Sequence, residues 1–143
     1  MNFIQDRSTF VDPPFGCPAD IQVHLPMPPS VNRIWRSTRA GQGDRRVSIS
    51  PEYKSWKRQA DMLAIAMGAL RGIRKIQGPF AATIIIKRGR GDLDNRIKGV
   101  LDWAQSRELV RDDKDCEKLT IEYGEAPHGC LLTLWAMPPR EAA

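Results

Sequence analysis

The hydrophobic and polar positions of the chain predict four strands. Residues 20–25 alternate with period two, which is typical of a half-buried strand. Residues 80–87 form a continuous apolar and β-branched run, which indicates a fully buried strand. Residues 119–123 and 130–137 predict two further strands, and the turn residues at 127–129 predict that these two strands form a hairpin.

Two segments have the pattern of amphipathic helices. Ser50-Pro51-Glu52 supplies an N-cap hydroxyl, a proline at the first helical position and an acid in the first turn. A second helix is predicted from Arg96 to about Ser106, with inward positions Ile97, Val100, Leu101 and Ala104. The first helix runs for about five turns to a stop at Gly72, and its core-facing stripe is Tyr53, Trp56, Ala60, Leu63, Met67 and Leu70.

These elements predict one small domain of the α/β (α+β) class. The expected architecture is a mixed β-sheet with two main helices, in the order β-loop-α-β-α-β-β. Residues 1–19 contain three prolines and no periodicity, so we expect an irregular arm. Residues 20–138 form the domain, and residues 139–143 form a tail. Residues 32–46, rich in arginine and glycine, are predicted to be a flexible loop.

The charge of the chain is unevenly distributed. Residues 33–98 contain 16 basic side chains and five acidic ones, whereas residues 99–125 contain four basic and eight acidic ones. Such a division is typical of a polyanion-binding surface around a metal site. On charge alone, solvated helix faces explain it equally well. Residues 33–46 carry five arginines and no lysine, which favours phosphate as the partner, because guanidinium groups bind phosphate oxygens in pairs.

Several protein classes are excluded. The chain has no run of 18 apolar residues, so no membrane span is predicted, and residues 1–6 lack the pattern of a secretory signal. Its three cysteines are widely spaced and form neither a disulfide framework nor a zinc site, so we expect a cytoplasmic protein. The two histidines, His24 and His128, are too few and too far apart for a His-rich metal site.

The candidate chemistry lies at the junction between the buried strand and the second helix. Asp92 and Asp94 are two residues apart, so in extended backbone both carboxylates point the same way. Two carboxylates that close repel each other unless a proton or a cation lies between them. Oxygen ligands favour Mg²⁺ or Mn²⁺ over zinc. The alternative is that Asp94 caps the helix and Asp92 supports its dipole.

Two neighbouring features strengthen the metal interpretation. Lys98 lies one helical turn beyond Asp94, where it can balance a carboxylate or contact a phosphate. The segment Arg111-Asp112-Asp113-Lys114-Asp115 supplies more carboxylates after the second helix, which returns the chain across the sheet, so this loop can come back near the first pair. Taken alone, Lys98 would be explained by an ordinary surface ion pair, and the acidic loop by exposure to solvent.

The combination resembles RusA, the family of Holliday junction resolvases of phages and prophages. The resemblance depends on Asp92-Leu93-Asp94-Asn95 with Lys98, and it extends through Asp102 to Val110-Arg111-Asp112-Asp113. An earlier segment, Leu25-Pro26-Met27-Pro28-Pro29-Ser30-Val31-Asn32-Arg33, is similar to the family's N-terminal motif. Two differences stand out, because the turn at 88–91 is less charged than in the family and residues 1–19 have no counterpart.

The resemblance implies a metal-dependent endodeoxyribonuclease that resolves four-way junctions by paired symmetric nicks. It implies that Asp92, Asp94 and Asp113 bind Mg²⁺, for which Mn²⁺ substitutes, and that Lys98 is the essential lysine. It also implies a homodimer in the cytoplasm of a bacterial host, encoded by a phage or by the cell.

The expected DNA contacts and supporting residues follow from the basic segments and from the motifs. Asn95, Asn32 and Asp112 are expected to hold the loops or the metal ligands in place. Trp35 is either a stacking residue at the junction or a core residue, and Trp103 and Trp135 are core or dimer residues. The dimer interface is expected on the second helix or on Leu131, Leu132, Leu134 and Trp135. The predicted DNA-binding residues are Arg33, Arg36, Arg39, Arg45, Arg46, Lys54, Lys57, Arg58, Arg88 and Arg90.

Three other functions remain open at this point. A metal nuclease acting on flaps or other branched DNA would use the same residues. A non-catalytic binder of branched DNA would use the acids only as helix caps and would bind without Mg²⁺. A phosphohydrolase or nucleotidyl transferase built on the Asp-x-Asp pair ranks last, because the chain has no Walker-type phosphate loop.

Overall fold

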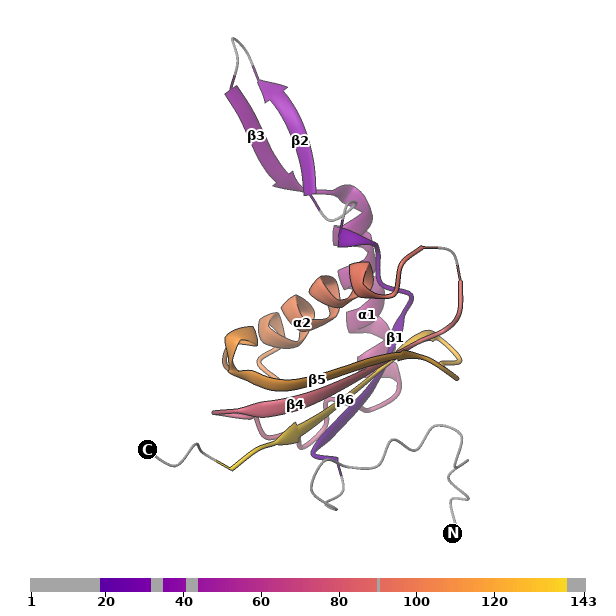
Figure 1. The fold of residues 1–143 in the computed structure, drawn as a ribbon, viewed down its shortest axis with the longest axis vertical. Coiled ribbons are helices and arrows are strands. Elements are labelled where there is room, and N and C mark those ends of the chain that lie inside the picture. The colour runs from indigo at the N-terminus through magenta and orange to yellow at the C-terminus, as the bar shows by residue number, and fades with distance from the viewer. Residues whose placement is uncertain (1–18, 32–34, 41–43, 90, 139–143) are drawn as a thin grey trace.

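A four-stranded mixed sheet forms the centre of the molecule, with both long helices on one face (Figure 1). The computed structural model describes residues 19–31, 35–40, 44–89 and 91–138, so the predicted tail and all but the last residue of the predicted arm lie outside it. The architecture confirms the predicted α+β domain. The sheet strands are β1 (Ile21–Pro26), β4 (Phe80–Ile86), β5 (Cys116–Tyr123) and β6 (Gly129–Ala136).

Strand β4 lies inside the sheet, as its composition predicts. All seven of its residues are buried. It pairs in parallel with β5 on one edge and antiparallel with β6 on the other, and β6 pairs antiparallel with β1. The strand order is therefore β1-β6-β4-β5.

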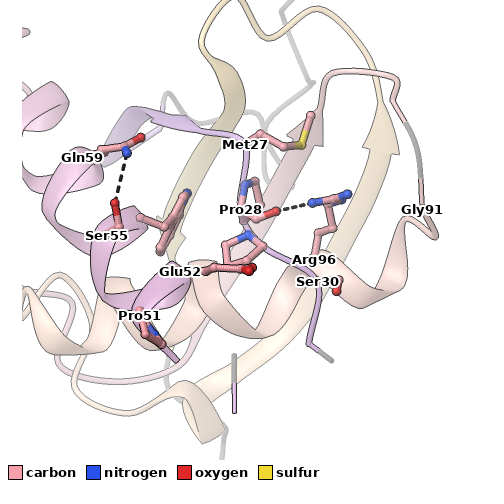
Figure 2. A pocket seen from close by; sticks show the side chains of 11 residues that line it. Met27, Pro28, Ser30, Pro51, Glu52, Ser55, Gln59, Gly91 and Arg96 are labelled. Carbon is pink, nitrogen blue, oxygen red and sulfur yellow. Dashed lines mark hydrogen bonds between the residues drawn. The ribbon is translucent and has the colours of Figure 1, made fainter. Parts of the chain in front are cut away.

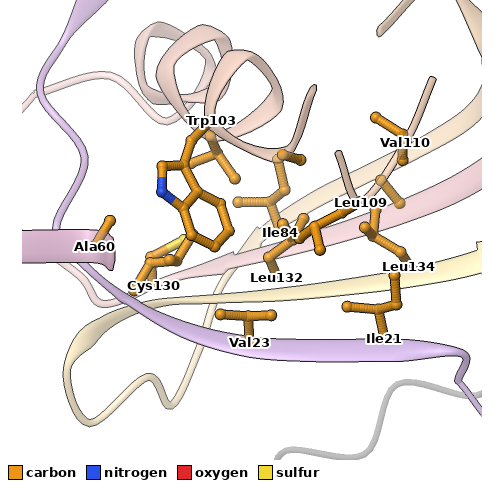
Figure 3. Close-up of a cluster of buried hydrophobic side chains, with 14 of the residues drawn as sticks. Ile21, Val23, Ala60, Ile84, Trp103, Leu109, Val110, Cys130, Leu132 and Leu134 are labelled. Atoms are coloured by element: carbon orange, nitrogen blue, oxygen red, sulfur yellow. The ribbon is translucent and has the colours of Figure 1, made fainter. Parts of the chain in front are cut away.

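The core lies between this sheet and the helices α1 (Pro51–Ala66) and α2 (Ile97–Ser106). Figure 3 shows Trp103 projecting from α2 onto the sheet beside Ile84 and Cys130. Trp103 is fully buried, and its indole N–H donates to Asp61 Oδ1 of α1 at 2.8 Å. Of the two roles predicted for Trp103, the structure supports the core role. Neither described helix is long and apolar enough to cross a membrane.

The start of α1 follows from its sequence, but its end does not. The Ser50 side chain accepts the backbone N–H of Tyr53 at 3.1 Å, which confirms the predicted N-cap. The helix ends at Ala66, earlier than the predicted stop at Gly72, because Gly68 adopts φ of +68° and Ala69 N–H donates back to Ala64. Met67, expected in the core-facing stripe, is consequently 48% exposed.

The predicted hairpin between the last two strands is wrong. β5 and β6 do not pair, because the more apolar β4 lies between them. Their connection passes the end of β4, where Gly124 N–H donates to Ile86 and Lys87 N–H donates to Gly129. β6 therefore lies within the sheet rather than in a terminal hairpin. The prediction that β6 supplies a dimer interface is also wrong, because the four residues named for it are buried within this chain. They are Leu131, Leu132, Leu134 and Trp135.

The loop predicted over residues 32–46 is also wrong in its described part. Strands β2 (Trp35–Ala40) and β3 (Asp44–Ile49) pair antiparallel and project from the body of the molecule beyond the start of α1 (Figure 1). Among the arginines, Trp35, Val47 and Ile49 supply the β-forming residues. The connection between the strands contains two glycines, which is typical of a hairpin turn.

Gly129 provides a test of how β6 approaches the segment after β1. It has φ of +121°, which L side chains rarely adopt, and an added Cβ would lie 2.9 Å from Met27 Cα. We expect Gly129→Ala to lower the free energy of unfolding by about 2–3 kcal/mol, measured by urea denaturation. Gly78→Ala is the matched control, because no atom lies within 4 Å of its added Cβ. Equal midpoints for the two variants would contradict this account.

Candidate functional site

The predicted acidic pair lies at the end of β4, in the turn that leads into α2. Asp92 and Asp94 are both exposed. A short 3₁₀ turn, Asp94–Arg96, precedes α2, and neither this turn nor α2 has a side-chain cap. Asp92 Oδ2 instead accepts the Asn95 side-chain amide in a long hydrogen bond of 3.5 Å. The alternative in which Asp94 caps the second helix is therefore wrong.

Lys98 has a different partner from the expected one. Its ammonium group lies 3.2 Å from Asp102 Oδ1, one turn further along α2, rather than on Asp94. The pair is partly exposed, so it contributes little to stability. Its effect is to hold the Lys98 ammonium group at a fixed place on the surface of α2.

The loop after α2 returns to this same side of the helix. Asp113 begins a 3₁₀ turn, and its backbone N–H donates to the Gln105 side chain of α2 at 3.0 Å. Asp112 caps the turn by accepting Lys114 N–H at 2.9 Å. Gln105 was not predicted as a site residue, and its sequence position alone gives no reason to select it.

The electrostatics of Asp113 show which charged groups surround it. Burial raises the pKa of Asp113, and its hydrogen bond with Asp112 and the charge of Asp102 raise it further, while Lys98 opposes the shift. The pKa of Asp112 is lowered, mainly because its carboxylate accepts the backbone N–H of Lys114. Lys98, Asp102 and Asp113 therefore form one interacting group on the surface of α2.

A buried tyrosine lies next to this group. The Tyr53 hydroxyl of α1 is buried and has no hydrogen-bond partner among the residues that the structure describes. Burial, followed by the charge of Asp102, raises the pKa of Tyr53 to about 12. Its ring stacks on Trp56 at 6.0 Å between centroids. The sequence predicted Tyr53 only as a core residue, because its helical spacing carries no information on its closeness to Asp102.

The donor set of the site consists of oxygen atoms, which suits Mg²⁺ or Mn²⁺. Among residues 19–31, 35–40, 44–89 and 91–138, however, no three His, Cys, Asp or Glu side chains are close enough to hold one metal ion. Asp92 and Asp94 lie before α2, whereas Asp113 lies beside it with Lys98 and Asp102. A metal ion bound by all three predicted ligands would need the two segments to approach each other.

A hollow of about 850 Å³ adjoins the acidic turn (Figure 2). The Pro28–Ser30 segment forms one wall, the first turns of α1 form another, and Gly91 and Arg96 complete the lining. Arg96 Nη1 donates to the Pro28 carbonyl at 2.5 Å, and Trp56 Nε1 donates to the Pro26 carbonyl at 3.0 Å. Arg96 was predicted only as a helix start, and no local pattern indicated that it reaches a residue 68 positions away.

The predicted DNA-binding residues lie in three places. Lys54, Lys57 and Arg58 are on the first turns of α1, where Lys57 Nζ lies 5.6 Å from the centre of the Tyr53 ring. Arg88 lies over the Tyr123 ring at 4.6 Å. The four arginines of the projecting hairpin occupy positions on β2 and β3: Arg36, Arg39, Arg45 and Arg46. The predictions for Asn32, Arg33 and Arg90 lie outside the described residues.

Comparison of the chain with models of known protein families gave no match, and comparison with curated proteins gave none either. The resemblance to the RusA family therefore depends on the quoted motifs alone.

The raised pKa of Asp113 predicts that this carboxylate costs stability. The folded chain binds the Asp113 proton more tightly than the unfolded chain does, so ionisation opposes folding above the folded pKa. We expect Asp113→Asn to raise the Tm by about 1–2 °C at pH 7. The gain should shrink as the pH falls towards the unfolded value of 3.8, where both states become protonated.

Asp115→Asn is the matched control for this measurement, because it lies on the same 3₁₀ turn. Its carboxylate accepts two N–H groups of Arg111 at 3.0 and 3.1 Å. The control should lower the Tm or leave it unchanged. A Tm for Asp113→Asn that falls in parallel with the control would show that Asp113 is a structural residue.

Proposed function

We propose that the chain is a metal-dependent endodeoxyribonuclease that cuts four-way DNA junctions by paired nicks. The observation that carries the proposal is the meeting of two distant segments. The Pro28–Ser30 segment lines one hollow together with Gly91 and Arg96, the residues on either side of the acidic turn, and Arg96 donates a hydrogen bond to the Pro28 carbonyl. These are the two segments on which the resemblance to the RusA family depends, so their proximity supports a common site.

The exposed acids support a catalytic role better than a structural one. Asp92 and Asp94 make no side-chain cap on the 3₁₀ turn or on α2, and burial, followed by the hydrogen bond with Asp112, opposes the ionisation of Asp113. Carboxylates whose surroundings oppose their ionisation are typical of functional sites. We propose that Asp92, Asp94 and Asp113 bind Mg²⁺, with Mn²⁺ as a substitute. When bound, such an ion supplies an activated water and stabilises charge on the attacked phosphate.

The remaining residues have positioning and electrostatic roles in this proposal. The Lys98 ammonium group, held by Asp102, neutralises charge on the phosphate. Asn95 orients the Asp92 carboxylate through their side-chain hydrogen bond. Lys54, Lys57 and Arg58 bind the DNA backbone beside the hollow. A homodimer with two-fold symmetry supplies the two sites that paired nicks require.

A cleavage assay tests the proposal. The protein is incubated with a labelled four-way junction, a linear duplex of the same sequence and a flap, in Mg²⁺ and in EDTA. We expect paired nicks in the junction only, lost in EDTA. Lys98→Ala should reduce the cleavage rate about 10²–10³-fold. Asp92→Asn should abolish cleavage and keep junction binding, because affinity comes mainly from phosphate contacts.

Asp115→Asn is again the matched control, because it removes an acid that is paired with Arg111, and it should cleave at the wild-type rate. Preferential cutting of the flap would replace the junction with another branched substrate. Junction binding without cleavage in either Mg²⁺ or Mn²⁺ would overturn the nuclease and leave a structural DNA-binding protein.

A further inference from the structure

The β2–β3 hairpin is a two-stranded ribbon that stands clear of the sheet (Figure 1). Its register pairs Trp35 with Ile49 at the end nearest the body and Ala40 with Asp44 at the far end. The large apolar pair therefore lies at the end nearest the body, and the arginines are spread along the rest of the ribbon. A ribbon arranged in this way has no core of its own to bury, which is typical of a binding element.

The arginines occupy both faces of the ribbon. Directly opposed residues of an antiparallel pair share a face, and the faces alternate along each strand. By register, Arg36 and Arg46 fall on one face, and Arg39 and Arg45 fall on the other. The strands hold four arginines against a single acid, Asp44.

One pair in this register points to an anionic ligand. Arg39 lies directly opposite Arg45, and Arg46 follows in the chain. Like charges directly opposite each other destabilise a β-ladder. A polyanion between or around the guanidinium groups removes this repulsion, so the pairing is costly in isolation and favourable in a complex.

We propose that the β2–β3 ribbon enters the major groove of a duplex DNA arm next to the cut site. The B-DNA major groove admits a two-stranded ribbon, and arginine forks bind both phosphates and the guanine edge in that groove. β3 is followed directly by Ser50 and α1, so the ribbon continues into the basic first turns of α1 and the hollow. The proposal rests on the proposed function, because it names how that site holds its DNA.

The test measures binding of the full chain to a duplex of about 20–30 base pairs in EDTA, where cleavage plays no part. The variant Arg39→Ala/Arg45→Ala is compared with the control Arg71→Ala/Arg74→Ala, which removes the same charge from exposed positions outside the ribbon. We expect the slope of log K against log salt to fall by about 2 for the ribbon variant only. Arg39→Lys/Arg45→Lys should keep most of the slope, which excludes misfolding as the cause.

Methylation interference identifies the groove. Dimethyl sulfate modifies guanine N7, which lies in the major groove. Methylated guanines in one arm should weaken wild-type binding at least tenfold and should have little further effect on the ribbon variant. Equal slopes for the ribbon and control variants, interference that the ribbon variant retains, or stronger binding to an RNA duplex would each overturn the proposal.

The outcomes separate this inference from the proposed function. A ribbon effect in a protein that never cuts DNA would keep the ribbon proposal and overturn the nuclease. Junction cleavage with no ribbon effect would do the reverse. A wild-type protein that binds no DNA at low salt would overturn both.

Discussion

The complete burial of β4 is the constraint on which the rest of the structure depends. Its seven residues, six of them apolar, are all buried and the strand is paired on both edges, so it lies inside the sheet. A parallel partner on one edge requires a crossover connection, and α2 supplies it. The ends of that crossover carry the two acidic segments, Asp92–Asp94 before α2 and Asp112–Asp113 after it. The position of the candidate site is therefore a consequence of how the sheet is built.

The second consequence of this architecture is the meeting of segments far apart in the chain. β1 ends on β6, and the close approach of Gly129 to Met27 directs the following prolines towards α2. There Arg96 and Trp56 each donate a hydrogen bond to a proline carbonyl. The proline-rich segment accepts these bonds at carbonyls because proline has no N–H to donate. These two bonds join the segment after β1 to α1 and to the turn before α2, on either side of the hollow.

Part of the fold and of the candidate site could be predicted from residues that are neighbours in the sequence. The Ser50 cap, the apolar run of β4 and the inward face of α2 are each determined by neighbouring residues, and all three were predicted. The pairing of β5 was not, because turn residues at 127–129 fix a change of direction and not the identity of the neighbouring strand. The β2–β3 hairpin was not predicted because its arginines fall on both faces and leave no regular alternation of apolar and polar residues. Among the site residues, Asp92, Asp94 and Lys98 were selected by their spacing, and Asp113 by the resemblance to the RusA family.

The partners of those site residues could not be predicted in the same way. The bond of Lys98 to Asp102, the contact of Gln105 with Asp113 and the closeness of Tyr53 to Asp102 each depend on tertiary packing. They also explain why the carboxylates form two groups in the described chain. Lys98 contacts Asp102 on α2, and Gln105 accepts the backbone N–H of Asp113, whereas the turn with Asp92 and Asp94 is joined through Arg96 to Pro28. Binding of a divalent ion is the event that would draw the two groups together.

The most direct measurement is an NMR titration of the full chain with Mn²⁺, whose unpaired electrons broaden the signals of nearby nuclei. The account predicts that substoichiometric Mn²⁺ broadens the amide signals of residues 92–98 and 112–115 together. It also predicts that Asp92→Asn weakens both effects in parallel. Broadening of only one of the two segments, or broadening of 112–115 that Asp92→Asn leaves unchanged, would contradict a shared metal centre.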